Sequence, residues 1–171
     1  MLSRMNRKYT REDYLSRVAM IREILPDVAL TTDMMVGFPG ETEEDFADTL
    51  SLAELCRFHS AFTFVYSRRR GTVADAMQDQ VPEEVKTERI KRLVALQKEI
   101  ASSVAKEYYQ NKTFEVLFEA ADTRDPSRIT GRTGAGRLVS VKGDPSLIGT
   151  FGHVKVTKAG ANSLFGELTE V

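Results

Sequence analysis

The sequence predicts an α/β segment followed by a small all-β domain. Residues 1–110 alternate helix-like and strand-like stretches, whereas residues 113–171 contain short β-rich runs separated by glycine-rich turns. Hydrophobic residues make up 42% of the chain and charged residues 29%, a balance typical of a folded globular protein. The change of pattern predicts two domains, 1–110 and 111–171.

Two helix starts are marked by the same local signal. Thr10 and Asp13 form a capping-box pattern, in which each side chain satisfies a backbone N–H of the first turn. This helix carries an apolar stripe and ends at Pro26. Thr42 and Asp45 repeat the pattern and predict a second helix.

Strands are expected on either side of the second helix. Residues 28–36 form a largely apolar run that ends at the GFPG turn, 37–40. Residues 61–67 are rich in aromatic and β-branched side chains. A strand, a helix and a strand in this order predict a parallel βαβ unit with a right-handed crossover. A long helix follows over 82–109, with Pro82 at its first position.

The tail is expected to fold as a small five-stranded antiparallel barrel. Short strands in so few residues are typical of a closed barrel, because closure removes exposed edges. The expected strands are TFEVLFEA (113–120), RITGRT (128–133), RLVSVK (137–142), GHVKVT (152–157) and SLFGELTEV (163–171).

The first half holds too few strands for a protected sheet. Parallel strands need neighbours on both sides and cover on both faces, and only two are expected here. We therefore expect residues 1–110 to be part of a larger α/β barrel whose earlier strands precede this sequence.

Composition excludes several kinds of site. The chain has one cysteine, Cys56, and two histidines, His59 and His153, so no disulfide can form within it. These residues are too few for a zinc or iron–sulfur site of the usual kind, and neither histidine has the neighbours of a catalytic base. Cys56 is expected to be an inert, half-buried thiol.

Nothing in the sequence indicates export or a membrane span. No apolar run approaches the roughly 20 residues that cross a bilayer, and the first ten residues lack a signal peptide's apolar core. We expect a cytoplasmic location and no membrane partner. The net charge is −1, so nucleic-acid binding would require a local basic patch.

Four ordered blocks and the tail together resemble the carboxy-terminal half of a known enzyme family. The blocks are MNRKYTREDY (5–14), TTDMMVGFPGETEEDF (31–46), FTFVYSRRRGT (62–72) and DQVPEEVKTERIKRL (79–93), and the tail ends GANSLFGELTEV (160–171). They are similar to the MiaB-type tRNA methylthiotransferases, and the tail is similar to the TRAM domain that closes those enzymes.

The resemblance implies a fold and a reaction. The expected fold comprises the last two βα units of a radical-SAM partial TIM-type barrel, a long linking helix and an OB-like TRAM barrel. Family members bind S-adenosylmethionine and two 4Fe–4S clusters, and add a methylthio group to C2 of N6-isopentenyladenosine beside the tRNA anticodon. The implied partners are tRNA and the enzyme's amino-terminal part.

The resemblance also implies that this chain alone is catalytically incomplete. It lacks the family's two three-cysteine cluster sets, and Cys56, expected in the middle of a helix, matches neither. Reductive cleavage of S-adenosylmethionine needs a cluster that three thiolates normally hold. We therefore expect no catalytic or metal-binding residue in this chain, and no cofactor stably bound to it alone.

Other functions stay open. RimO-type enzymes, which modify a ribosomal protein, share VGFPGET and the TRAM domain. The basic SRRRGT segment and NSLFGEL favour the tRNA-modifying group. A stand-alone RNA-binding module and a non-catalytic relic are the remaining alternatives.

Candidate cofactor-binding residues lie at the ends of the two expected strands. By resemblance, Val36, Gly37 and Phe38 help to hold the adenine of S-adenosylmethionine, although the spacing alone indicates only a strand-to-helix turn. Tyr66 and Ser67 end the second strand, where active sites of parallel barrels are built. Glu41 is explained by a place in the first turn of a helix.

Asp33 interrupts an otherwise apolar strand. Strand alternation puts it on one face with Thr31 and Met35, a face that would line the barrel interior. A charged side chain there is costly unless it is paired. We favour a buried aspartate with a structural hydrogen-bonding role over a ligand contact.

Basic residues form two candidate RNA-binding groups. Arg68 and Arg70 of the loop stand where the family pattern has prolines, and Arg68, Arg69 and Arg70 either contact RNA phosphate or form a solvated turn. The tail group is expected on or beside strands and comprises Arg128, Arg132, Arg137, Lys142, Lys155 and Lys158. Most tail aromatics, Phe114, Phe118, Phe151 and Phe165, are expected in the core, which favours phosphate contacts with little base reading.

Overall fold

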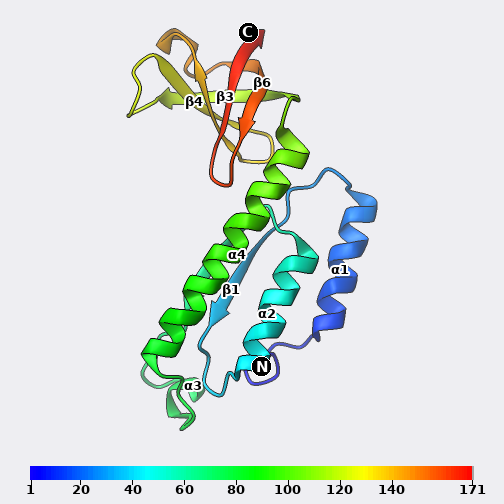
Figure 1. Ribbon diagram of the computed structural model, residues 1–171, viewed down its shortest axis with the longest axis vertical. Helices are drawn as coiled ribbons and strands as arrows, with labels where there is room; N and C mark the ends of the chain where they lie inside the picture. The colour runs from blue at the N-terminus through cyan, green and yellow to red at the C-terminus, as the bar shows by residue number, and fades with distance from the viewer. Residues whose placement is uncertain (171) are drawn as a thin grey trace. The chain divides into compact units, whose positions relative to one another are not determined.

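The computed structural model describes residues 1–170 and divides into two compact units, Met1–Ile100 and Ala101–Val171. Figure 1 shows the elements of each unit in chain order. The division falls inside the longest helix, whereas the sequence pattern places it near residue 110. No helix among the described residues is long and apolar enough to cross a membrane.

Both expected capping boxes are present in the first unit. Helix α1 spans Arg11–Ile24 and helix α2 spans Glu43–Cys56. The hydroxyls of Thr10 and Thr42 each accept a hydrogen bond from the backbone N–H three residues on, at 3.1 Å. Cys56 is the last residue of α2, so the expectation that it lies in mid-helix is wrong.

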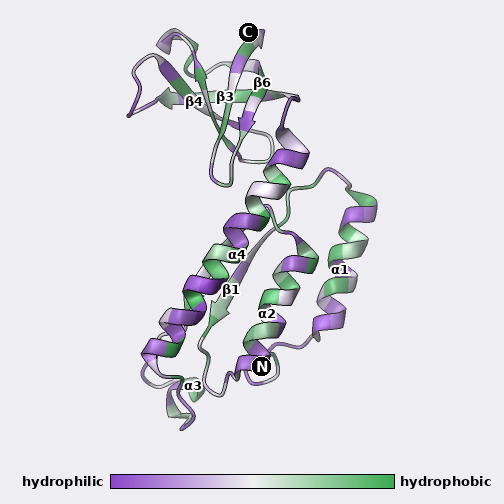
Figure 2. Ribbon diagram, in the orientation of Figure 1, coloured by the Kyte–Doolittle hydropathy of each residue, from purple (hydrophilic) through white to green (hydrophobic). Residues whose placement is uncertain are grey.

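The third long element, α4, spans Glu83–Tyr109 and starts just after Pro82, one residue later than expected. Pro82 serves instead as the residue whose carbonyl accepts the first helical hydrogen bond, from Lys86, at 3.0 Å. Two short elements had no clear sequence signal: helix α3, Val73–Ala76, and the 3₁₀ helix η1, Pro145–Leu147. Hydrophobic and hydrophilic residues alternate along the long helices, which marks their buried and exposed faces (Figure 2).

Strands β1, Thr31–Val36, and β2, Ser60–Val65, form the expected parallel pair. Both are shorter than the apolar runs that predict them, because residues 28–30 and 66–67 lie outside the ladder. One face of the pair packs on the helices, in a core that includes Val36, Phe46 and Leu93. The other face carries exposed side chains.

The second unit is a closed five-stranded barrel with strand order β3-β4-β5-β7-β6. The strands are β3 Thr113–Ala121, β4 Arg128–Thr133, β5 Leu138–Lys142, β6 Phe151–Ala159 and β7 Leu164–Glu170. All neighbouring pairs are antiparallel except β5–β7, which is parallel. The expectation of a fully antiparallel barrel is therefore wrong at the β5–β7 pair.

The barrel core uses only part of the tail's aromatic content. Phe118 and Tyr109, from the end of α4, are fully buried, and Phe114 packs against them. Phe151 and Phe165 are instead exposed, at 58% and 38%. The expectation that most tail aromatics are core residues is thus wrong for these two, which occupy outward positions of β6 and β7.

Candidate cofactor wall and RNA-binding surface

The turn after β1 is tightly constrained. Gly37 and Gly40 have φ angles of +77° and +80°, a region that side chains other than glycine rarely adopt. The backbone N–H of Gly37 donates to Glu41 Oε2 at 2.7 Å, so the turn is closed by a buried carboxylate. This arrangement fixes the path of the chain between β1 and α2.

Glu41 is held from the other side by α4. Arg89 Nη1 lies 2.8 Å from Glu41 Oε2 and 3.1 Å from the Glu41 carbonyl oxygen. Both side chains are buried, so the pair is shielded from solvent. Burial raises the pKa of Glu41 above its ordinary value, and the Gly37 amide and Arg89 offset that rise only in part. Glu41 precedes Thr42, the N-cap of α2, so the expectation that it lies in the first turn of a helix is wrong.

Lys86 lies one turn before Arg89 and packs against the same segment. Its aliphatic stem covers Gly37 and occupies the space that a Cβ at that glycine would need. Its Nζ lies 2.7 Å from Glu83 Oε1 and 5.5 Å from the Tyr66 ring centroid. The lysine thus joins the end of β2 to the turn after β1.

Sequence analysis missed Lys86 and Arg89. A signal was available, because both continue the helical stripe that leads to the buried Leu93 and Gln97. Charged residues at such stripe positions indicate buried partners, since an unpaired buried charge is costly.

The expected cofactor residues divide into packed and exposed groups. Val36 and Phe38 pack close to Tyr66: the Tyr66 N–H donates to the Val36 carbonyl at 2.9 Å, and the rings of Phe38 and Tyr66 meet edge to face at 5.2 Å. Gly37 is part of the same turn. Ser67 is exposed.

A groove of about 950 Å³ lies beside this turn, between residues 1–14 and the carboxyl half of β1. Phe38 is the one expected cofactor residue that lines it, together with Met35 and Phe64. Asp33 also lines the groove and is exposed, so the expectation of a buried aspartate is wrong. The aspartate avoids a burial cost because its strand face is open.

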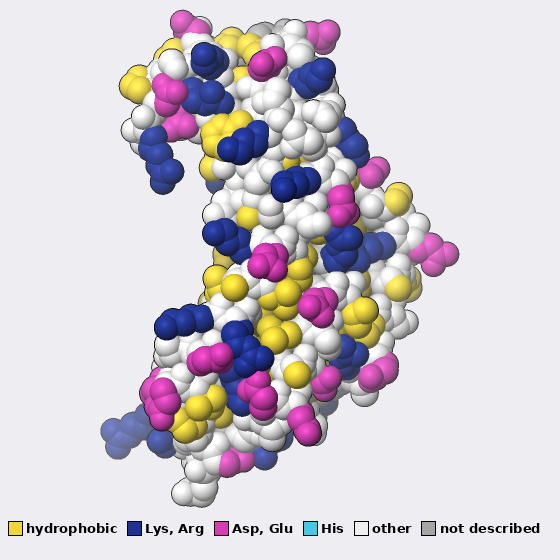
Figure 3. All heavy atoms as spheres, viewed as in Figure 1, with side chains coloured by type: hydrophobic (Ala, Val, Ile, Leu, Met, Phe, Trp, Pro, Cys, Tyr) yellow, Lys and Arg dark blue, Asp and Glu magenta, His cyan; other side chains and the backbone are white. Residues whose placement is uncertain are grey.

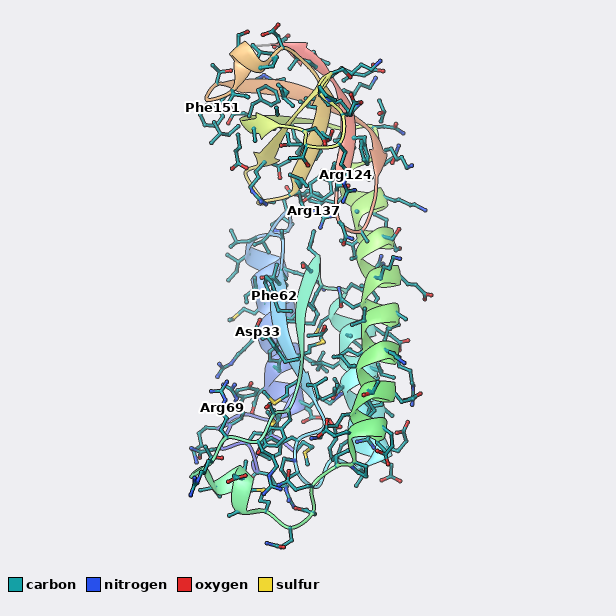
Figure 4. The ribbon with its side chains drawn as sticks, turned by 90° about the vertical axis from the view of Figure 1, so that its left-hand side faces the viewer. Asp33, Phe62, Arg69, Arg124, Arg137 and Phe151 are labelled. Atoms are coloured by element: carbon teal, nitrogen blue, oxygen red, sulfur yellow. The ribbon has the colours of Figure 1, made fainter. Side chains whose placement is uncertain are left out.

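That open face is largely apolar. Met35, Phe62 and Phe64 are 39%, 65% and 49% exposed, and in the parallel register Phe62 and Phe64 stand beside Asp33 and Met35. Figure 4 shows Asp33 and Phe62 on this side of the strands. Flat apolar surface of this kind usually marks an interface or a binding wall.

The three loop arginines have different surroundings. Arg68 forms an ion pair with Asp75 at 2.9 Å and also bonds the Asp75 carbonyl, which ties the loop to α3. Arg69 lines the groove, and Arg70 is exposed. Of the three, Arg69 and Arg70 are therefore the better placed to contact a ligand.

Arg132 and Arg137 of the barrel both make internal contacts, but only Arg137 is half-buried. Arg137 Nη2 bonds the carbonyls of Gly160 and Ala161 at 2.8 Å, and its half-buried guanidinium lies 5.9 Å from the Tyr109 ring centroid. Burial lowers the pKa of Arg137 and raises that of Tyr109 to about 12. Arg132 is exposed but pairs with Glu119 at 3.2 Å.

Arg128 belongs to a polar group on the outer surface of β4, β5 and β7. Its guanidinium bonds the Ser140 hydroxyl at 2.8 Å and the Ser140 carbonyl at 2.7 Å. It lies 5.4 Å from the ring centroid of Phe165, and Lys158 lies 6.0 Å from the same centroid. Two cations thus flank one exposed aromatic ring.

Lys155 lies in more acidic surroundings. In the sheet register it stands opposite Glu167 of β7, while its neighbour His153 stands opposite Glu115 and Glu170. Acidic and basic side chains are likewise interspersed over the face of each unit that Figure 3 shows. A basic site on the barrel is therefore local.

The residues present do not fit an iron–sulfur cluster. Among residues 1–170 no group of three or more histidine, cysteine, aspartate or glutamate side chains is placed to hold a metal ion. Cys56 is buried, and burial raises the pKa of its thiol, which disfavours the thiolate that iron needs. The groove beside Phe38 has a mixed lining, with Met35, Phe38 and Phe64 among its apolar residues and Asp33 and Arg69 among its charged ones.

Comparisons with known proteins agree with this division. Residues 1–53 match the radical SAM superfamily model and residues 107–169 match the TRAM domain model. Similar curated relatives carry the name tRNA-2-methylthio-N(6)-dimethylallyladenosine synthase. The chain is 49% identical to the protein of Thermoanaerobacter sp. (strain X514), over 99% of this chain and 36% of that protein. It is 47% identical to that of Clostridium novyi (strain NT), over 98% and 37%.

The chain thus spans little more than a third of the length of these relatives. The radical SAM match covers α1, β1 and most of α2, and the TRAM match covers the strands of the closed barrel. Over nearly its whole length the chain is therefore similar to part of the MiaB-type, tRNA-modifying radical-SAM methylthiotransferases.

Proposed function

We propose that this chain is part of a tRNA methylthiotransferase that adds a methylthio group to C2 of N6-isopentenyladenosine beside the anticodon. The observation that carries the proposal is identity of 47–49% over nearly the whole chain to relatives named for that nucleoside. The chain contributes one wall of the cofactor site and a surface that holds tRNA. Because tRNA is modified in the cytoplasm, we place the protein there.

The first unit supplies the cofactor wall. S-adenosylmethionine provides this family with its radical and its methyl group. The adenine would lie in the groove against Phe38, with Val36 and Tyr66 behind that ring and Gly37 and Ser67 at the ends of the strands. The buried Glu41–Arg89 pair would keep the turn from moving when the ligand binds.

The iron–sulfur clusters lie outside this assignment. The single cysteine cannot hold either cluster, so the thiolates come from elsewhere in the enzyme and the chain alone carries no catalytic residue. We propose that the amino-terminal part of the enzyme is a partner, covering the apolar face that Phe62 and Phe64 leave open.

The second unit supplies the tRNA contact. Small closed barrels bind single-stranded nucleic acid across a strand face with basic and aromatic groups. Candidate contacts are Arg128, Arg132 and Lys155 on the barrel, with Arg69 and Arg70 on the loop after β2. Arg68 and Arg137 donate hydrogen bonds within the chain, so their role would be to hold the backbone near these contacts in place.

A chimeric enzyme tests the proposal. The matching 170 residues of the Thermoanaerobacter relative are replaced by this chain, and the chimera is expressed in a bacterial strain that lacks the enzyme. Mass spectrometry of tRNA nucleosides then measures 2-methylthio-N6-isopentenyladenosine. Restored modification supports the proposal. A chimera that folds, retains both clusters and leaves the nucleoside unmodified contradicts it.

The sister reaction on a ribosomal protein gives the matched control. The same cells are assayed for a methylthio group on that protein's target aspartate. Modification of the aspartate in place of the tRNA would assign the chain to the RimO-type enzymes.

A stand-alone RNA-binding module is the second candidate, and the closed barrel favours it. It predicts tight tRNA binding by the chain, together with a chimera that binds tRNA normally and modifies neither substrate.

A further inference from the structure

Phe165 is an aromatic side chain at an outward position of the barrel strand β7. Its neighbours on β7, Leu164 and Gly166, point inward and are buried, while Phe165 is 38% exposed. Nothing in the core requires an aromatic residue at this position. An exposed ring costs hydrophobic free energy that a ligand would recover.

Cations surround this ring on neighbouring strands. Phe165 stands between Ser140 on β5 and Lys158 on β6 in the sheet register. The Arg128 guanidinium and the Lys158 ammonium lie 5.4 Å and 6.0 Å from the ring centroid. Lys142, exposed at the end of β5, pairs in register with Arg128. Two basic side chains therefore lie close to the ring, and Lys142 ends the strand next to it.

The geometry of Arg128 is preorganised. Two hydrogen bonds to Ser140 hold its guanidinium, and the Ser140 hydroxyl donates in turn to Asp122 at 3.1 Å. A cation that is already fixed loses less conformational entropy when it binds an anion. Asp122 orients this group, but its charge also limits how basic the surface is.

Other outward positions of the barrel differ in charge. β3 contributes Glu115 and Glu119, and on β7 the next outward residue after Phe165 is Glu167, which stands opposite Lys155. A polyanion is disfavoured there and favoured where Arg128, Lys142 and Lys158 lie. The aromatic ring and the favourable charges thus coincide on one surface.

We propose that Phe165 stacks on an unpaired base of a bound RNA while Arg128, Lys142 and Lys158 contact the flanking phosphates. This inference rests on the proposed function and names the surface and the type of RNA element, a single-stranded loop. A base that stacks on Phe165 would also lie over the Arg128 guanidinium. Such contacts accept any base, so the surface contributes affinity with little sequence preference.

A pair of matched variants tests the inference. Phe165→Leu removes the ring and keeps an apolar side chain. Phe151→Leu makes the same change at the more exposed ring on β6, which lies opposite Leu117 and away from the Phe165 cluster. Binding of an anticodon stem-loop RNA with 2-aminopurine in its loop is followed by fluorescence, at fixed salt, with circular dichroism confirming the fold of each variant.

We expect Phe165→Leu to weaken binding by about tenfold and to lose the 2-aminopurine quenching, since one base stack contributes roughly 1–3 kcal/mol. Phe151→Leu is expected to bind within about twofold of the original chain. Phe165→Tyr should restore both binding and quenching.

Two results separate failure of this inference from failure of the proposed function. If the original chain binds the RNA and Phe165→Leu binds equally well, or both leucine variants weaken binding equally, the Phe165 surface is wrong and tRNA binding stands. If the original chain does not bind the RNA at all, the tRNA-binding role itself fails.

Discussion

Glu41 and Arg89, forty-eight residues apart, form a buried ion pair in which Arg89 Nη1 lies 2.8 Å from Glu41 Oε2. The same carboxylate oxygen accepts the Gly37 N–H, so one buried group joins α4 to the turn after β1. The turn that we assign to the cofactor wall is therefore held by a contact from outside its own βα unit.

Loss of Arg89 is expected to destabilise the first unit strongly. Arg89→Met leaves Glu41 buried without its charged partner, and breaking a buried pair in this way costs about 3–5 kcal/mol. The free energy of unfolding is measured by urea denaturation followed by circular dichroism, since the chain has no tryptophan.

Arg92→Met is the matched control for Arg89. Arg92, on the same helix as Arg89, forms an ion pair with Glu43 of α2 at 2.7 Å, but both side chains are exposed. An exposed pair contributes about 0–1 kcal/mol. Equal losses for the two variants would contradict a special role for the buried pair.

Acid is expected to weaken the start of α2. The Thr42 backbone amide, with its hydroxyl, holds the pKa of Asp45 below the ordinary 3.8. A lowered pKa in the folded state means that Asp45 stabilises the fold above its unfolded pKa and that this contribution disappears as pH falls through the folded pKa. Asp45→Asn should therefore flatten the decline in unfolding free energy below about pH 4.

The pKa shift of Glu41 is opposite in direction to that of Asp45, so the two residues change stability with pH in opposite ways. Burial raises its pKa, so its protonated form favours the folded state below the unfolded pKa, and that contribution is lost as pH rises through the folded pKa. An acid limb in the original chain that Asp45→Asn leaves unchanged would show that the capping box contributes little.

The local elements could be predicted from the sequence because their signals are local. Thr10 and Thr42 mark helix starts by their own side chains, and the change from βαβ spacing to short strands marks the second domain. The parallel β5–β7 pair could not be predicted, since strand order depends on closure of the whole barrel.

The candidate sites were harder to predict for the same reason. The candidate Phe38 follows from its place at a strand end, but the burial of Arg89 depends on Glu41 and its turn, forty-eight residues earlier in the chain. Asp33 was expected to be buried but is exposed. Strand alternation shows which face of the strand a residue occupies, but not whether other elements cover that face. The sequence pattern predicts that Arg137 is a surface cation, but in the fold its guanidinium lies over the Tyr109 ring and donates to the Gly160 carbonyl.

Gly166 is expected to be required for barrel closure. A Cβ at this position would overlap the Lys155 backbone and the Val154 side chain, neither of which can move freely. Gly166→Ala should cost about 1–3 kcal/mol by overpacking. Thermal unfolding of Gly134→Ala, where a Cβ meets nothing within 4 Å, serves as control and should differ by less than about 0.5 kcal/mol. Equal melting temperatures would exclude close packing as the reason for glycine.

The open face of β1 and β2 is expected to make the chain associate with itself. The side chains of Phe62 and Phe64 on β2 are 65% and 49% exposed, and they stand beside Asp33 and Met35 of β1. Replacing both by serine should reduce binding of a hydrophobic dye and shift sedimentation towards the monomer, because the apolar surface is lost. Unchanged sedimentation and dye binding would show that this face is already covered.

The measurement that tests the central claim most directly is the salt dependence of tRNA binding by the intact chain. Anisotropy of a labelled anticodon stem-loop is titrated at several salt concentrations. Three phosphate contacts from Arg128, Lys142 and Lys158 contribute about −2 to the slope of log K against log salt, from about −0.7 per contact for single strands. The triple alanine variant should therefore make the slope less steep by about 2, and any remaining slope comes from the other candidate contacts. No binding at low salt, or binding with no salt dependence, would contradict the assignment of this barrel as a tRNA-binding surface.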